Sequence, residues 1–184
     1  MGKDLTEKAF KNLIQKHIKN TSFVKITLDN DSAIFGFPVK LSDDFLMIEE
    51  TYDFSLAGIK IVPYKKVRSV RHNKYDKVSK AIYLDEDLVH FNQDIIDKTS
   101  LESAESLFKS IKKQNFHCIV ESKKNKEDLF SIGEILEVNE KSVMINNYDP
   151  AGRINKKPRK ISFKNIDLIN FNDNYSKVFR KYAK

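Results

Sequence analysis

The chain has 184 residues with a formal net charge of +7; 40% of the residues are hydrophobic and 32% are charged. This composition is typical of a soluble folded protein rather than a disordered chain, and no apolar run approaches the ~20 residues that cross a bilayer, so we expect no membrane partner. The single cysteine excludes an intrachain disulfide and favours a reducing compartment, which predicts a cytoplasmic location.

The first segment, residues 1–83, is predicted to open with a helix and to continue with five short strands. Apolar residues at helical spacing give the helix one apolar face, made by Leu5, Phe10, Leu13, Ile14 and Ile18. Turn-rich breaks separate the strands, which we place near 23–28, 33–41, 45–50, 58–63 and 67–71. Only Lys65 and Lys66 can turn the chain between the last two, a corner typical of a small, strongly bent barrel.

Residues 84–98 form an acidic, partly apolar connector without Gly, Ser or Pro, so we expect it to be ordered rather than flexible. The second segment, residues 99–184, begins with a predicted capping box from Thr99 to Glu102 and a helix. The apolar stripe of that helix is Leu101, Ala104, Leu107, Phe108 and Ile111. Five strands follow, near 116–121, 129–138, 142–147, 159–163 and 166–170.

The two segments repeat one pattern. Residues 62–70 reappear as 161–169 with every apolar position kept, and Gly36 reappears as Gly133. A four-residue piece downstream also recurs, as Tyr75-Asp-Lys77-Val78 and Tyr175-Ser-Lys177-Val178. A duplication of this length indicates two copies of one small domain, so we divide the chain into 1–83, the connector 84–98, and 99–184.

Two spacings characterise each copy. A glycine is followed seven positions later by an acidic residue, in the pairs Gly36 and Asp43, and Gly133 and Glu140. Apolar residues then recur at spacings of five and three, in the sets Val62, Val67, Val70 and Ile161, Ile166, Ile169. With a helix and five bent strands, this pattern resembles the Sm-like family. The resemblance implies an α+β, mostly β fold with two tandem Sm-like five-stranded bent barrels, each preceded by an α-helix.

The copies depart from the family at its RNA pocket. Sm-like proteins that bind uridine-rich RNA use an asparagine in strand three and an Arg-Gly pair before strand five. Leu46 and Val143 stand at the asparagine position and offer no hydrogen bonds to a base edge. The Arg-Gly pair is replaced by Pro63-Tyr64 and Ser162-Phe163. The family commonly forms rings, whereas a covalent tandem can pair its barrels internally.

Two clusters of cations are candidates for binding nucleic acid. One lies in the loop between strands three and four of the second copy and comprises Arg153, Lys156, Lys157, Arg159 and Lys160. Such a loop can track phosphates, although a solvated hairpin tip explains it equally well. The other comprises Lys65, Lys66, Arg68 and Arg71, followed by His72, Lys74 and Lys77. Tyr64 and Tyr75 interleave with it, but equivalent aromatics recur in the second copy, so we predict that they are core.

No pattern indicates catalysis, a cofactor or a metal site. The four histidines and Cys118 show no ligand spacing, and the five glycines provide no phosphate-cradling loop. Cys118 lies in an apolar strand and is predicted to be buried and inert. The neighbouring carboxylates Glu49 and Glu50 are predicted to lie on a strand surface. We therefore expect no enzyme, no cofactor and no metal.

The sequence favours a non-catalytic protein that binds a macromolecule. One hypothesis is binding of RNA or DNA backbone through the basic surface of the second barrel. Residues 99–184 hold the basic excess, with 17 Lys or Arg against 11 Asp or Glu. The alternative is a protein-interaction or self-association module that uses barrel strand edges. Cations of both clusters on one face would favour nucleic acid, and scattered cations beside an open apolar edge would favour protein.

Overall fold

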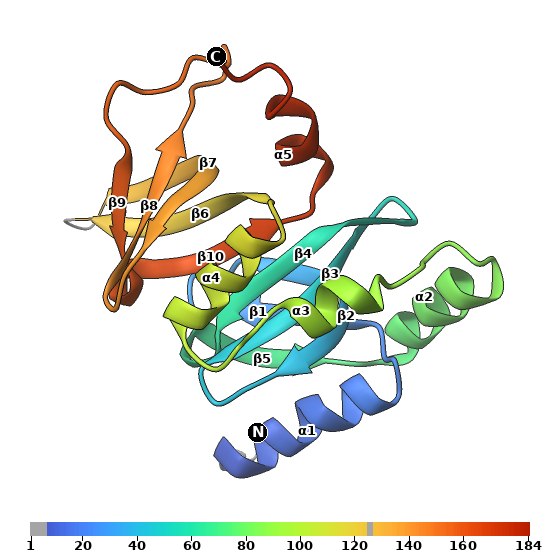
Figure 1. Cartoon of the computed structure of the whole chain (residues 1–184). Helices are drawn as coiled ribbons and strands as arrows, with labels where there is room; N and C mark the ends of the chain where they lie inside the picture. The colour runs from blue at the N-terminus through green and yellow to red at the C-terminus, as the bar shows by residue number, and fades with distance from the viewer. Residues whose placement is uncertain (1–6, 125–126) are drawn as a thin grey trace.

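The computed structural model describes residues 7–124 and 127–184 (Figure 1). Within them, each half of the chain contributes a helix, five strands and a C-terminal helix, which is 12 residues long in the first half and 6 in the second. The elements of the first half are α1 (Glu7–Lys19), β1 (Val24–Leu28), β2 (Ala33–Leu41), β3 (Phe45–Tyr52), β4 (Ser55–Pro63), the 3-10 turn η1 (Tyr64–Lys66), β5 (Val67–Arg71) and α2 (Lys74–Asp85).

The second half follows the same order after one additional short helix. Its elements are α3 (Gln93–Lys98), α4 (Ala104–Lys113), β6 (His117–Lys124), β7 (Glu127–Val138), β8 (Ser142–Asn147), β9 (Arg159–Ser162), the 3-10 turn η2 (Phe163–Asn165), β10 (Ile166–Phe171) and α5 (Asn174–Phe179). The connector predicted at 84–98 therefore contains α3, whose Ile95 and Ile96 are buried.

All ten strands of the described residues join one antiparallel sheet in the order β5-β1-β2-β3-β4-β10-β6-β7-β8-β9. The prediction of two tandem five-stranded bent barrels is therefore wrong. Closing a barrel requires the two outer strands of one half to pair with each other. Instead β4 pairs with β10 of the other half, with Ile61 opposite Ile169 and Ile59 opposite Phe171. The halves do pair internally, but they do so as one open sheet.

Buried apolar side chains of both halves form one continuous cluster. It contains Met47, Ile59 and Ile61 from the first half and Val120 and Phe171 from the second. α3 and α4 lie over this cluster (Figure 1), and α4 contributes the fully buried Leu107, Phe108 and Ile111. Because burial of apolar surface is the dominant favourable force in folding, this shared core holds the two halves together.

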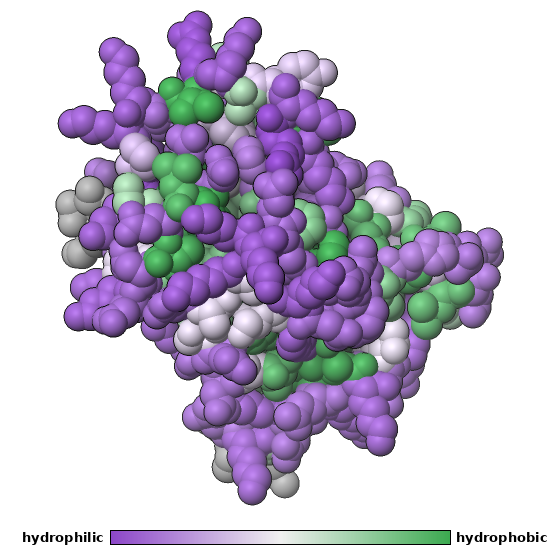
Figure 2. Space-filling model, in the orientation of Figure 1, coloured by the Kyte–Doolittle hydropathy of each residue, from purple (hydrophilic) through white to green (hydrophobic). Residues whose placement is uncertain are grey.

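The helices of the first half cover separate parts of the sheet. Ile14 of α1 packs against Val24 and Ile26 of β1. α2 packs through Tyr83, whose ring contacts Phe23 and Phe37. The outward face of α2 is partly apolar. In Figure 2 the surface is mostly hydrophilic, with hydrophobic residues near α2 at the right of the view.

Strand positions follow the sequence pattern closely. The strands predicted at 33–41, 67–71 and 142–147 match β2, β5 and β8 to the residue. β4 begins three residues earlier than predicted, because Asp53 and Phe54 both adopt positive φ (47° and 58°) and form a tight hairpin turn. An aromatic residue is not the usual occupant of such a turn, so the sequence pattern did not reveal it.

The predicted helix starts were less accurate. Thr99 does not cap α4; it ends α3, where its hydroxyl donates to the Ile95 carbonyl at 2.7 Å. α4 is capped instead by Ser103 in a capping box with Ser106. Leu5, predicted on the first helix, lies outside the described residues. α2 and α5 were not predicted, although Asn73-x-x-Asp76 and Asp173-x-x-Ser176 are capping patterns.

Candidate functional site

The predicted cation cluster of the first half has four members on η1 and β5, and ion pairs neutralise three of them. These four are Lys65, Lys66, Arg68 and Arg71. Lys66 Nζ lies 2.8 Å from Asp167 Oδ1 and 3.2 Å from Asp29 Oδ2, and Arg68 pairs with Asp31. The pKa of Lys66 is raised, chiefly by its hydrogen bond to Asp167. Lys65 is exposed and has no ionic partner among the residues that the structure describes.

Arg71 has a structural role at the start of α2. Its Nε and Nη2 donate to the two oxygens of Asp76 at 3.0 and 2.7 Å, and the Asn73 N–H donates to the same carboxylate. Burial opposes ionisation of Asp76, but these hydrogen bonds outweigh it and hold its pKa below the ordinary value. Arg71 therefore pairs with the capping box of α2, because the buried carboxylate of Asp76 requires a partner.

The predicted cation cluster of the second half is not neutralised by ion pairs with described residues. Its members, on the β8–β9 loop and on β9, are Arg153, Lys156, Lys157, Arg159 and Lys160. All but Arg159 are exposed, and none makes an ion pair with a described residue. Arg159 Nη1 donates to the Phe130 carbonyl at 2.7 Å and to the Ser131 hydroxyl at 3.1 Å. Arg159 therefore joins β9 to β7, while the other four cations face solvent.

The β8–β9 loop is held in place by short-range and long-range hydrogen bonds. Asp149 Oδ1 accepts from the backbone N–H groups of Ala151 and Arg153. The Gly152 carbonyl accepts from the Lys184 N–H at 2.8 Å, and the Lys184 carbonyl accepts from the Ile154 N–H at 3.0 Å. The loop cations are therefore carried on a backbone of fixed shape.

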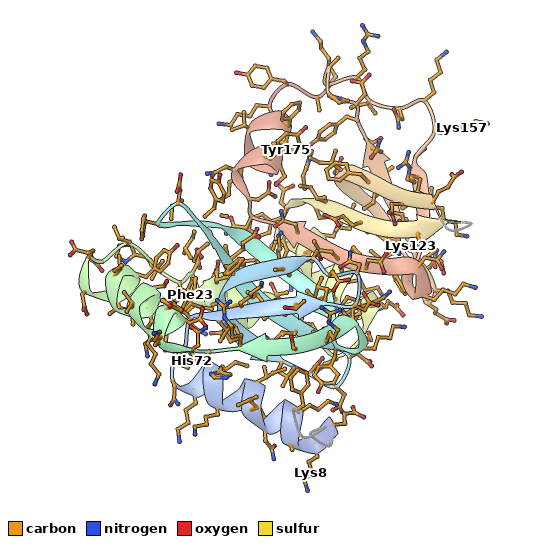
Figure 3. The ribbon with its side chains drawn as sticks, turned by 180° about the vertical axis from the view of Figure 1, so that it is seen from behind. Lys8, Phe23, His72, Lys123, Lys157 and Tyr175 are labelled. Carbon is orange, nitrogen blue, oxygen red and sulfur yellow. The ribbon has the colours of Figure 1, made fainter. Side chains whose placement is uncertain are left out.

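The two predicted clusters do not share a surface. They lie on or beside β5 and β9, which are the two outer strands of the ten-stranded sheet. Figure 3 shows Lys157 in the upper half of the molecule and His72, the residue after Arg71, in the lower half. The unpaired cations of the β8–β9 loop and β9 are therefore not continued by the cluster on η1 and β5, where only Lys65 lacks an ionic partner among the described residues.

A cavity of about 1230 Å³ adjoins the free cations, between β9 and the β6–β7 hairpin. Four cations and two carboxylates contribute to its lining: Lys123, Lys141, Arg159, Lys160, Glu127 and Glu140. The pair of Lys123 with Asp128 is long, at 3.7 Å, and both side chains are largely exposed, so it neutralises little. The sequence analysis missed Lys123 and Lys141, because only strand pairing brings them beside β9.

A smaller cavity of about 310 Å³ also contains Arg159 in its lining. Its other walls include the aromatic residues Phe130, Tyr148 and Tyr175 and the amide side chain of Asn147. Phe130 and Tyr175 are 52% and 45% exposed, whereas Tyr148 is buried. The Tyr148 hydroxyl makes no hydrogen bond with a described residue, and burial raises its pKa to about 12.

Several sequence predictions for single residues can now be compared with the structure. Cys118 is fully buried, as predicted, and burial raises its pKa to about 12. Tyr64 is buried as predicted, but Tyr75 is 66% exposed, so that its assignment to the core was wrong. Glu49 is only 2% exposed, and burial raises its pKa to about 7. Its predicted place on the strand surface was therefore wrong.

The described residues contain no group of three or more His, Cys, Asp or Glu side chains that could hold a metal ion. In the same part of the chain, no helix has the length and apolar character needed to cross a membrane. No protein-family model, curated protein or solved structure matches the chain.

Proposed function

We propose that the protein binds the phosphate backbone of a nucleic acid through the β8–β9 loop and the adjoining 1230 Å³ cavity. The observation that carries this proposal is the set of four exposed cations without ion pairs, namely Arg153, Lys156, Lys157 and Lys160. Three of them stand on the β8–β9 loop and Lys160 stands on β9, beside two more lysines in the cavity wall. Release of counterions from phosphates by such cations drives sequence-independent binding.

The alternative, assembly through strand edges, is less favoured by the chemistry of the free edges. The internal seam of the sheet sets Ile59 and Ile61 opposite Phe171 and Ile169. The repeat-equivalent positions at the two outer edges hold Pro158, Lys160, His72 and Val70. Proline and charged side chains at an edge oppose pairing with another strand. The two basic clusters are separated, as the protein-binding hypothesis expected, but the β9 edge holds Pro158 and Lys160, and His72 and Val70 at the β5 edge are less apolar than the seam residues Phe171 and Ile169.

The proposal is tested by the salt dependence of binding to a labelled single strand, measured by fluorescence anisotropy. Replacing the four loop cations by serine should flatten the slope of log affinity against log salt by about 3, from ~0.7 for each lost contact. A matched control replaces four lysines of α1 and β1, on the other side of the sheet order from β9, namely the exposed Lys8, Lys16 and Lys19 and the half-exposed Lys25. Figure 3 shows Lys8 at the opposite end of the molecule from Lys157.

The control variant should keep the slope of the unmodified protein although it loses the same charge. Equal effects of the two variants would mean that net charge acts without a site. Absence of binding at low salt would overturn the proposal.

A further inference from the structure

The 310 Å³ cavity combines two exposed aromatic rings with polar groups, and it lies beside the β8–β9 loop. Phe130 comes from β7 and Tyr175 from α5, so two separate elements supply its aromatic walls. A concave site that combines aromatic walls with a few polar groups is the usual form of a ligand-binding pocket. The cavity volume is at the lower end of the range of about 300–1,000 Å³ for small-molecule sites.

The aromatic walls are held before any ligand arrives. The Tyr175 ring stacks on Phe179 with centroids 4.4 Å apart, and Phe179 stacks on the buried Tyr148 at 6.4 Å. The Phe130 backbone carbonyl accepts the hydrogen bond from Arg159. A preformed site loses little conformational entropy on binding, which favours affinity.

The polar groups of the cavity suit a flat ligand with both donors and acceptors. Arg159 has no acidic partner among the described residues, and only its Nη1 is engaged. The Asn147 amide accepts from the Ile132 N–H at 2.8 Å. Asn155 and Asp149 complete the polar part of the lining, and Asp149 accepts from two backbone N–H groups. This mixture suits a neutral heteroaromatic ring better than a bare anion, which the carboxylate would repel.

We propose that this cavity receives one unstacked base of a single-stranded nucleic acid whose phosphates lie on the β8–β9 loop. The inference rests on the proposed function and adds the class of nucleic acid. Bases stack on aromatic side chains irrespective of sequence, and a duplex does not present an unstacked base. Arg159 lines both cavities and therefore links the base site to the phosphate-binding surface.

The test compares Phe130→Ala and Tyr175→Ala with variants at two exposed aromatics of the first half, Phe35→Ala and Tyr75→Ala. Tyr75 is the repeat equivalent of Tyr175 and is 66% exposed, but it lies on α2. Anisotropy should show single-strand binding weakened about 5- to 150-fold by each cavity variant, the range for loss of one stacked base. The salt slope should not change, because stacking involves no counterion release. The two control variants should bind as the unmodified protein does.

A second measurement uses the unmodified protein and so does not depend on how a variant folds. A labelled strand with abasic sites keeps its phosphates but has no base to stack, so it should bind more weakly by the same factor. A duplex of the same length should also bind more weakly than the single strand. Equal affinity for all three probes, with normal salt dependence, would overturn the base site and leave backbone binding intact. Absence of binding to any probe would overturn both.

Discussion

Glu49 is expected to make the protein less stable as the pH rises from about 4.5 to about 7. Its carboxyl group is buried on β3, and no described residue donates a hydrogen bond to it. Burial raises its pKa from the ordinary 4.5 to about 7, against the opposing effect of the Lys177 charge. The folded state therefore keeps a proton that the unfolded state has already lost. The contribution of Glu49 to the free energy of unfolding is therefore fully present below pH 4.5 and is lost as the pH rises through 7.

The size of this effect follows from the two pKa values. A difference of one pKa unit corresponds to about 1.36 kcal/mol, so the change from 4.5 to about 7 corresponds to about 3 kcal/mol in the free energy of unfolding. Urea denaturation followed by circular dichroism, repeated across this pH range, measures it. Glu49→Gln should remove the decline and should be more stable than the unmodified protein above pH 7.

Two features make the Glu49 experiment specific. Burial lowers the pKa of His17 and His117, so these histidines cause stability to rise with pH and oppose the trend. The difference between variant and unmodified protein cancels their contribution. The control is Glu50→Gln, at the neighbouring residue, whose carboxylate lies 2.8 Å from Lys60 Nζ. If Glu49→Gln declines with pH as the unmodified protein does, the reasoning from burial is refuted.

Three further outcomes are expected. Gly36→Ala and Gly133→Ala should each lower the free energy of unfolding, measured in urea, by about 3 kcal/mol, which is the upper end of the range for overpacking. The reason is that each new Cβ would lie 2.1 Å from a backbone carbonyl oxygen of the adjacent strand. Unchanged stability would contradict that close approach. Asp76→Ala should cost about 1–2 kcal/mol and reduce helical circular dichroism, since the capping box of α2 loses its N3 carboxylate and Arg71 loses its buried partner; an unaltered spectrum would argue against this role of Asp76. Cys118 should not react with a maleimide in the native protein but should react in denaturing urea, because its thiol is inaccessible and protonated; rapid native labelling would contradict its burial.

The strands could be predicted from the sequence because each one has a local pattern of turn residues and apolar residues. β2, β5 and β8 lie between turn residues and show the apolar pattern of a strand, so local inspection places them to the residue. The pairing of β4 with β10 has no local signal. Ile59 and Phe171 are far apart in the chain, and their apolar character fits a closed barrel as well as an open sheet. The resemblance between copies therefore suggested two separate barrels where the chain builds one sheet.

The candidate site was predicted only where its residues are adjacent in sequence. The loop cations from Arg153 to Lys160 form a visible run, whereas Lys123 and Lys141 join them only through strand pairing. Tyr75 was assigned to the core because its equivalent Tyr175 recurs in the second copy, yet both are exposed. A duplicated aromatic residue can be retained for packing or for a surface role, and sequence alone does not separate the two.

The central position of β10 has a consequence for how the protein is made. β4 ends at Pro63, but its hydrogen-bonding partner begins only at Ile166, after nearly the whole second half has been synthesised. Until then the growing chain carries an unpaired strand edge with Ile59 and Ile61 on it, a surface on which other nascent chains can add strands. The ribosome therefore releases the strand that covers this edge only after β5 to β9, and during that interval the edge of β4 is open to pairing with other chains.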